Sequence, residues 1–169
     1  MKKFEFTGEV KTLWWGCKVQ RIRALVEIDL GWTVVKPGDL GGWLEKESNL
    51  SHDGKAWVWG NAEVWGNAKV CGDAKVWGNA KVCGDAFLFR AEHLLTIGAI
   101  GSRNDFTTFF RNKKGEIKVK CGCFLGTVDE FLAKVQQTRG DTKFAVVYRA
   151  CVTVALAQID TTPYEGEVK

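Results

Sequence analysis

The middle of the chain repeats a six-residue pattern of small, variable and aliphatic positions. Residues 56–91 read AWVWGN, AEVWGN, AKVCGD, AKVWGN, AKVCGD and AFLFRA. Side chains alternate between the two sides of an extended strand, so the repeated alanines and aliphatic residues share one side. We predict that this side is buried. The Gly-Asn and Gly-Asp pairs fall at the expected corners, because these residues tolerate positive φ.

A strict hexapeptide period predicts a parallel β-helix, in which each repeat supplies one short strand and one corner. Three repeats close one coil, so residues about 18 apart are expected to stack. Two weaker repeats, Gly42-Trp43-Leu44 and Ser48-Asn49-Leu50, come before the regular ones, and an insertion at Gly54-Lys55 shifts the phase. The repeats are therefore expected to begin at residue 42.

The same alternation places large apolar residues on the outside of the repeats. That much apolar surface is not expected to stay exposed to water. The chain's own ends can cover part of it, or a second copy can, which favours self-association as a symmetric ring. The predicted outward residues are Trp57, Trp59, Trp65, Cys71, Trp77, Cys83, Phe87 and Phe89.

The segments on either side of the repeats are not periodic. Alternating patterns at 4–10 and 19–28 predict strands that cap the first coil. After residue 92 the pattern predicts three strands, at 94–97, 106–111 and 116–121. Thr127 and Glu130 form a capping box that starts a helix, and a second helix is expected from near Asp141 past Ala157. The predicted domains are 1–41, 42–91 and 92–169.

Composition narrows the classes of function. The 169 residues are 46% hydrophobic and carry a net charge of +4, so bulk charge predicts no nucleic-acid partner. The start of the chain lacks the apolar core of a signal peptide, and no stretch has membrane-spanning length. We therefore expect a cytoplasmic protein whose six cysteines are reduced. Cys121-Gly122-Cys123 lacks a second ligand pair, so neither a metal nor a cofactor is predicted.

Donor groups gather in one loop of the C-terminal module. The loop 98–105 and the strand after it carry hydroxyl, guanidinium and amide groups that suit a phosphate or another anion. A second donor-rich element, 122–127, is expected to open a helix with free backbone N–H groups. The alternative is that the loop satisfies its own groups and Thr127 is only a cap. The predicted ligand-binding residues are Ser102, Arg103, Asn104, Asp105, Thr107, Thr108, Arg111, Gly126 and Thr127.

No catalytic residue is predicted. The chain has two histidines, His52 and His93, and neither belongs to a recognisable Ser/His/Asp or Cys/His set. Cys123 has no base candidate near it in the sequence, and it is expected to be a small buried residue.

The repeats resemble the hexapeptide families of left-handed β-helices, whose best-known members are trimeric acyltransferases that use acyl-CoA or acyl carrier protein with a histidine base. Here no histidine lies within residues 56–91. More closely, Gly38-Asp39-Leu40-Gly41-Gly42-Trp43 with the GNAxV repeats, and Gly101-Ser102-Arg103-Asn104-Asp105 with Cys121-Gly122-Cys123-Phe124, are similar to uncharacterised hexapeptide-repeat proteins of bacteria, prophages and phages. This resemblance implies a β-solenoid plus α+β fold: a short left-handed parallel β-helix with a small C-terminal module, favouring a homotrimer.

The predicted function is non-enzymatic binding. The repeats would form an oligomerisation stem, and the C-terminal module would hold an anionic, nucleotide-like small molecule. The phage-like resemblance implies an anti-defence role in which a nucleotide immune signal is sequestered. Two alternatives stay open: a hexapeptide-repeat acyltransferase that uses His52 or His93, and a protein-interaction scaffold that inhibits a host protein.

Overall fold

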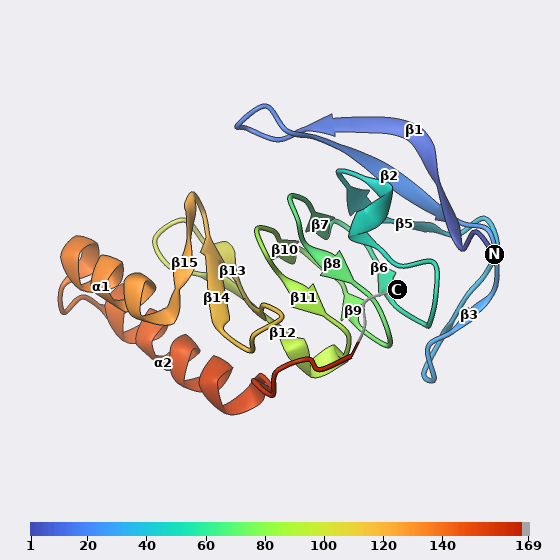
Figure 1. Cartoon of the computed structure of the whole chain (residues 1–169). Coiled ribbons are helices and arrows are strands. Elements are labelled where there is room, and N and C mark those ends of the chain that lie inside the picture. The colour runs from blue at the N-terminus through green and yellow to red at the C-terminus, as the bar shows by residue number, and fades with distance from the viewer. Residues whose placement is uncertain (167–169) are drawn as a thin grey trace. The chain divides into compact units, whose positions relative to one another are not determined.

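The computed structural model describes residues 1–166, and the chain divides into two compact units (Figure 1). The first unit is Met1–Ala91 and the second begins at Glu92. The last three residues of the predicted C-terminal domain, 167–169, lie outside the described residues. Each unit has its own sheets and its own buried residues, so each is described separately.

The first unit consists of strands and one short 3-10 helix, η1 (Glu47–Asn49). A five-stranded sheet has the order β1-β2-β5-β7-β10, and three pairs, β3-β4, β6-β9 and β8-β11, stand apart from it. The strands are β1 (Phe4–Thr12), β2 (Lys18–Ala24), β3 (Ile28–Asp29), β4 (Val34–Val35), β5 (Leu40–Leu44), β6 (Trp57–Val58), β7 (Glu63–Val64), β8 (Lys69–Val70), β9 (Lys75–Val76), β10 (Lys81–Val82) and β11 (Phe87–Leu88).

The predicted fold class, a β-solenoid with a short left-handed parallel β-helix, is wrong. Within residues 1–166 the strands fall into several separate sheets, mixed and antiparallel, accompanied by two α-helices. Each repeat contributes a strand of only two residues, and parallel pairs join residues 18 apart, such as Val64 with Val82. The five-stranded sheet is mixed, because β1 and β5 each run antiparallel to β2, while β5, β7 and β10 are parallel.

The inward side of the repeats is buried as the alternation predicts. Every repeated alanine from Ala56 to Ala86 and every aliphatic residue from Val58 to Leu88 is at most 1% exposed. The glycine at each corner has a positive φ, as at Gly66 (φ 69°). In each repeat an alanine and an aliphatic residue thus fill the interior, and the corner that follows needs a glycine because of its positive φ.

Two N-terminal hairpins cover part of the outward aromatic residues. Trp15, in the β1–β2 turn, has its ring 5.1 Å from Trp65, which is 8% exposed. Trp32, in the β3–β4 turn, lies 5.6 Å from Trp59 and 5.7 Å from Trp77 between ring centroids. Coverage is incomplete, because Trp32 and Trp77 remain 64% and 47% exposed.

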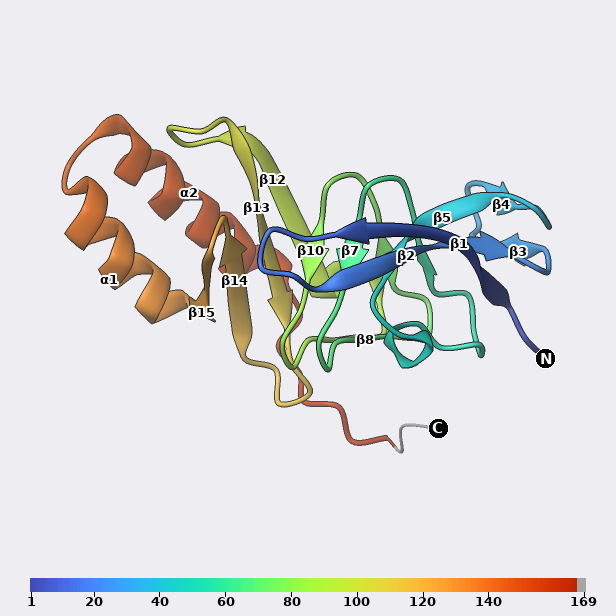
Figure 2. The same ribbon diagram turned by 90° about the horizontal axis from the view of Figure 1, so that it is seen from above.

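The second unit is an antiparallel sheet with two helices on one side (Figure 2). The strand order is β12-β13-β14-β15. Its elements are the 3-10 helix η2 (Ala91–His93), β12 (Leu94–Ile100), β13 (Asp105–Arg111), β14 (Ile117–Cys121), β15 (Phe124–Thr127), α1 (Val128–Arg139) and α2 (Lys143–Gln158). The strand β15 was not predicted. It forms because Gly122, with φ 56°, turns the chain tightly enough to pair Cys121 with Phe124.

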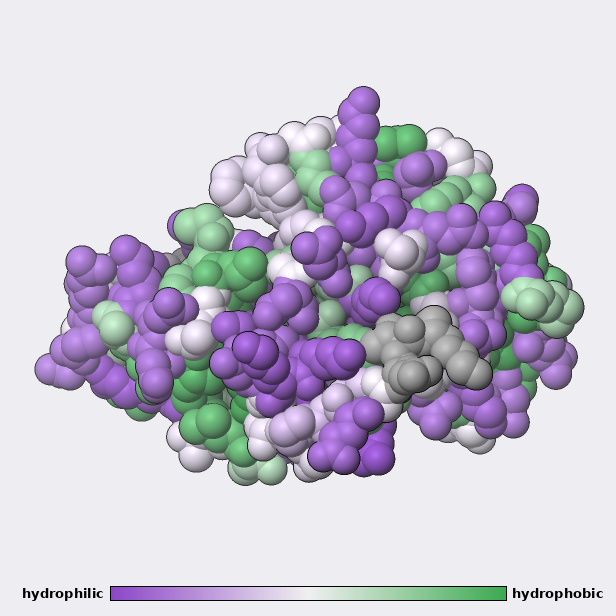
Figure 3. Space-filling model, in the orientation of Figure 1, coloured by the Kyte–Doolittle hydropathy of each residue, from purple (hydrophilic) through white to green (hydrophobic). Residues whose placement is uncertain are grey.

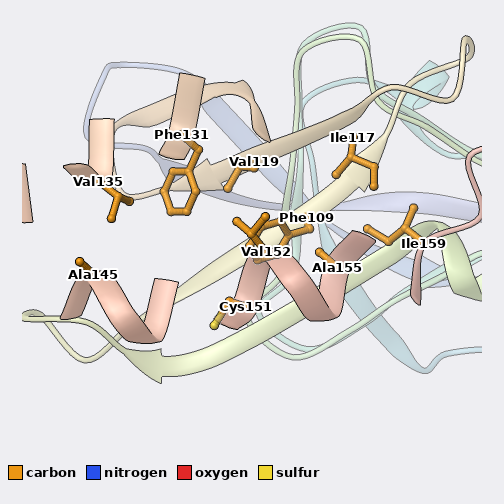
Figure 4. Close-up of a cluster of buried hydrophobic side chains, with 10 residues drawn as sticks. All are labelled: Phe109, Ile117, Val119, Phe131, Val135, Ala145, Cys151, Val152, Ala155 and Ile159. Carbon is orange, nitrogen blue, oxygen red and sulfur yellow. The ribbon is translucent and has the colours of Figure 1, made fainter. Parts of the chain in front are cut away.

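Both helices pack on the sheet through one apolar cluster (Figure 4). Phe109 and Val119 from neighbouring strands are fully buried, and Phe131 of α1 meets Phe109 edge-on at 6.3 Å between ring centroids. The other members of the cluster are Ile117, Val135, Ala145, Cys151, Val152, Ala155 and Ile159. The apolar positions that helical spacing predicts on α1, such as Phe131 and Val135, belong to this cluster, whereas on α2 Cys151 and Ala155 belong to it and Val147 is exposed.

The helix starts follow the sequence signals. Thr127 caps α1 as predicted: its hydroxyl accepts from the Glu130 N–H at 3.2 Å, and the Glu130 carboxylate accepts from the Thr127 N–H at 2.7 Å. The second helix begins after Thr142 and ends at Gln158, close to the predicted bounds. Among residues 1–166, no helix has the length and apolar character needed to cross a membrane.

Candidate ligand-binding site

A cavity of about 170 Å³ lies in the second unit, between the β12–β13 loop, the β14–β15 turn and the two helices. Four of the predicted ligand-binding residues line it: Ser102, Arg103, Asp105 and Thr107. The other lining residues are Ile100, Cys121, Gly122, Cys123, Phe124, Phe131, Lys134, Val135, Thr138, Arg139 and Tyr148. The structure therefore brings the predicted loop together with two helices that the sequence analysis had not assigned to the site.

The β12–β13 loop has a conformation that needs residues tolerant of positive φ. Gly101 has φ 72° and Asn104 has φ 49°, and the Asn104 N–H donates to the Gly101 carbonyl at 3.3 Å. A Cβ on Gly101 would collide with the Tyr148 hydroxyl. The close approach of Gly101 to α2 keeps Ser102 and Arg103 at the mouth of the cavity, where both are exposed.

Three cationic side chains from separate segments border the cavity: Arg103 from the loop, and Lys134 and Arg139 from α1. Arg139 donates through Nη2 to the Ser102 hydroxyl at 2.9 Å, which links the helix to the loop. Within residues 1–166, none of the three has a carboxylate at ion-pair distance. Asp105 also lines the cavity, and its carboxylate accepts from the Phe106 N–H at 2.7 Å.

The inner wall of the cavity is apolar and aromatic. Phe131 is 3% exposed, and its ring lies 5.3 Å from Phe124 and 5.6 Å from Tyr148 between centroids. Val135 and Ile100 complete this wall. The cavity therefore has a cationic entrance and an apolar, aromatic interior.

Tyr148 and Cys121 form a polar group within the apolar wall. The Thr107 hydroxyl donates to Cys121 Sγ at 3.2 Å, and Cys121 lies close enough to Tyr148 to affect its pKa. Burial, and then the neighbouring Cys121, raise the pKa of Tyr148 to about 12, although Arg139 and Arg103 oppose the shift. Tyr148 is therefore a protonated hydroxyl at neutral pH, able to act as a hydrogen-bond donor.

Other predicted ligand residues lie away from the cavity. Asn104 is exposed in the loop turn, and Thr108 is buried on the opposite side of β13 from Thr107. Arg111 is fully buried, and it donates to backbone carbonyls of Asn112, Lys113, Asp160 and Thr162. Its guanidinium thus holds the C-terminal segment, a role that the charge pattern could not reveal.

Gly126 and Thr127, predicted to bind an anion, also lie outside the cavity. Both residues belong to β15. The Thr127 N–H, which was expected to face a ligand, instead donates to the Glu130 carboxylate, and that contact lowers the pKa of Glu130. A helix start already occupied by its own carboxylate does not attract a second anion.

Sequence reasoning missed Lys134, Arg139 and Tyr148. Lys134 and Arg139 are on α1, five residues apart, and Tyr148 is on the next helix. The one sequence signal for these residues was Arg139 in the last turn of the predicted helix. Because basic residues are common at helix C-termini, this position alone does not indicate a ligand site. Their approach to the loop follows from how the helices pack on the sheet.

Neither histidine lines this cavity. His52, in the first unit, stacks on Phe4 at 4.5 Å between ring centroids; its Nδ1 accepts from the Lys3 N–H at 3.0 Å and its Nε2 lies 2.8 Å from Glu47 Oε1. His93 is fully buried, with Nε2 3.8 Å from the Asp160 carboxylate. Both ring nitrogens of His52 are thus already engaged, which leaves no free lone pair for general-base catalysis.

A second cavity, of about 370 Å³, lies in the first unit. His52, Lys3 and Lys55 line it together with the carboxylates of Glu27, Asp29 and Asp53, and its remaining lining residues are Met1, Val26, Ile28 and Gly54. Lys3 is 3% exposed and donates to the Ala56 carbonyl at 2.8 Å, and burial lowers its pKa to about 8. The mixed charges of this lining favour no single class of ligand.

Within residues 1–166 no cluster of three or more histidine, cysteine or acidic side chains could hold a metal ion. In comparisons with protein-family models, with curated proteins and with solved structures, the chain matches none of them. The feature of this chain most suited to binding a ligand is the cavity of the second unit, with cations at its edge and aromatic rings inside.

Proposed function

We propose that the second unit binds a small anionic molecule of the nucleotide class without converting it. The observation that carries this proposal is the group of three cations without carboxylate partners, Arg103, Lys134 and Arg139, at the edge of a cavity with an aromatic wall. Guanidinium groups bind phosphate through paired, charge-assisted hydrogen bonds. The apolar wall suits a flat ring, as in a nucleobase.

The size of the cavity sets how such a ligand would lie. Sites for whole drug-sized molecules are about 300–1,000 Å³, so a cavity of about 170 Å³ encloses only part of a nucleotide. We place the ring inside, against Phe124 and Phe131, and the phosphate outside, between Arg103 and Arg139. Ser102 and Tyr148 then supply neutral donors on either side of the phosphate.

The biological setting that we propose is a bacterial or phage-infected cytosol, where the protein sequesters a signalling nucleotide of host defence. The resemblance to hexapeptide-repeat proteins of phages and prophages motivates this role. A preorganised site can hold its ligand through charge-assisted hydrogen bonds alone, without any catalytic group. Self-association stays part of the proposal, although the trimer expected from the sequence depended on a solenoid, and residues 1–166 instead form several separate sheets.

Isothermal titration of the full chain against mono-, di- and cyclic nucleotides tests the proposal. Arg103→Ala and Arg139→Ala should each weaken binding by roughly tenfold or more, because each removes a hydrogen bond to a charged group. Lys114→Ala is the matched control: it removes an exposed cation from the same unit outside the cavity and should leave affinity almost unchanged. Absence of binding by the wild type, or equal loss in the control, would contradict the proposal.

A second candidate function is a protein-interaction scaffold. The exposed rings of Trp14, Trp32 and Trp77 favour it, since aromatic side chains supply much of the energy at protein interfaces. This function predicts that a host protein co-purifies with the wild type and is lost from Trp32→Ala. Nucleotide binding, by contrast, should not change in Trp32→Ala, so the two functions can be separated with one variant.

A further inference from the structure

The helix α2 has an unusual distribution of charge. Between Lys143 and Gln158 its only charged residues are Lys143 itself and Arg149, and it contains no acidic residue. The side that faces the sheet is buried through Ala145, Cys151, Val152 and Ala155 (Figure 4). A surface helix normally carries mostly charged and polar side chains on its other side, whereas the exposed ones on α2 are few: Lys143, Thr153 and Gln158.

The outer side of α2 is apolar and open to solvent. The exposed fractions are 59% for Val146, 36% for Val147, 49% for Val154 and 57% for Leu156. Ala150, between them, is exposed as well. Figure 3 shows hydrophobic surface in the region that α2 occupies in Figure 1. The valines and Ala150 follow the spacing of three and four residues that places side chains in one row on a helix.

This row is symmetric about Ala150. Val146 and Val154 stand four residues before and after it, and Val147 and Thr153 stand three residues before and after. When two copies of such a helix run antiparallel and cross at Ala150, Val146 of one copy faces Val154 of the other. A small residue at the crossing point lets the two helix axes come close together.

We propose that α2 is the contact surface of a two-fold dimer of this chain. An isologous interface requires a surface that complements itself, and the identical residues Val146 and Val154, equally far from the small residue Ala150, meet this requirement. The charges fit as well. In the antiparallel pair Lys143 lies beside the last turn of the partner helix, where carbonyl groups give a partial negative charge and α2 has no basic residue of its own.

The proposed dimer is independent of the ligand site. None of the apolar residues on the outer side of α2 lines the cavity of the second unit, and Tyr148 faces inward from the same helix. A helix of 16 residues is about 24 Å long, so one helix pair forms a small interface. We therefore expect a reversible dimer whose population depends on protein concentration.

Sedimentation equilibrium of the full chain, over roughly a hundred-fold range of concentration, tests the dimer. The wild type should fit a monomer–dimer equilibrium, and Val146→Lys should weaken dimerisation on the order of tenfold, because a cation enters an apolar contact. Val34→Lys is the matched control, since Val34 is 40% exposed on β4 of the other unit. Circular dichroism should show that both variants keep the helical signal.

A charge-pairing experiment identifies the partner and the geometry together. In the proposed dimer Val146 faces Val154, so the double variant V146K/V154E should recover dimerisation and V146K/V154K should not. A different protein as the natural occupant predicts a wild type that is monomeric at every concentration. That result would overturn the proposal, as would a trimer, a dimer unaffected by Val146→Lys, equal loss in Val34→Lys, or failure of V146K/V154E to restore association.

Discussion

In the first unit Lys11, a cation beside the repeats, has a carboxylate partner, whereas among the described residues the cations at the cavity of the second unit have none. Lys11 forms an ion pair with Glu63, whose side chain is only 7% exposed. Arg103, Lys134 and Arg139 have no such pair within residues 1–166. The difference separates charges that help to hold a fold together from charges that remain available to a ligand.

The hydrophobic cores of the two units differ in the size of their side chains and in the regularity of their packing. The repeats bury small residues, alanine and valine, in a regular series, and hairpins of the same unit cover part of their outward aromatic residues. The second unit buries large phenylalanine rings in an irregular cluster, and that irregular packing leaves a cavity. A periodic sequence fills its interior uniformly, and both cavities of the molecule are lined by residues outside the repeats 56–91.

The largest expected effect concerns the aromatic core. Phe109→Ala should lower the free energy of unfolding of the second unit by about 3–5 kcal/mol, because a fully buried ring is lost. All eight tryptophans lie in the first unit and both α-helices lie in the second. In urea, helical circular dichroism should therefore shift to lower concentration while tryptophan fluorescence does not. Equal shifts in both signals would show that the units unfold as one.

Removing a paired cation should cost more than removing an unpaired one. Lys11→Met leaves the nearly buried Glu63 carboxylate without its partner and should lower unfolding stability by about 1–3 kcal/mol. Arg103→Met should change it by less than about 0.5 kcal/mol, as at other exposed positions. Urea unfolding followed by both spectroscopic signals measures the two variants. A comparable loss in Arg103→Met would show that this arginine supports the fold.

The corner glycines of the first unit can be compared with one another. Gly54 and Gly78 both have positive φ, at 72° and 66°. A Cβ on Gly54 would come within 2.7 Å of the Gly72 carbonyl oxygen, whereas a Cβ on Gly78 meets nothing within 4 Å. Alanine at Gly78 should therefore cost about 1–2 kcal/mol for the backbone conformation, and alanine at Gly54 should cost more. Tryptophan fluorescence during urea unfolding measures the loss of unfolding free energy in each variant. Equal losses would show that the contact with the Gly72 carbonyl oxygen does not add to the cost at Gly54.

The smallest expected effect is a dependence on pH from Lys3. Its pKa in the folded protein is about 8, below the ordinary value of 10.5, so burial opposes the charged form. The folded state then binds fewer protons than the unfolded state between pH 8 and 10.5, and stability rises with pH there. From pH 8 to pH 9 the gain should be about 1 kcal/mol. Lys3→Met should lack this component of the pH dependence, and the same slope in both proteins would contradict the assignment.

The sequence predicted the local features of both units for identifiable reasons. The hexapeptide period places alanine and valine inside the repeats, and the pair Thr127 and Glu130 determines where α1 begins. The loop at Ser102 and Arg103 could be found because several donor groups are adjacent in the chain. Each of these features depends on residues that are close in sequence.

The errors concern residues whose neighbours are distant in sequence. The period correctly relates residues 18 apart, yet it does not determine how two-residue strands are distributed among sheets, and so the predicted solenoid was wrong. Arg111 was assigned to a ligand because burial cannot be recognised from charge alone. Lys134 and Arg139 reach the cavity through the packing of α1, which no local pattern specifies.

The buried guanidinium of Arg111 sets a limit on how far the chain can be shortened. Its hydrogen bonds to the carbonyls of Asp160 and Thr162 tie the residues after α2 to the end of β13. A chain cut after Gln158 would leave this cation buried without those acceptors. The free-energy cost of a buried cation that lacks hydrogen-bond acceptors is large compared with the net stability of a small protein. The Tyr164 N–H also donates to the Lys113 carbonyl at 3.1 Å. Residue 164 is thus the natural end point for any minimal version of the second unit, and a protease that trims the C-terminus should stop there.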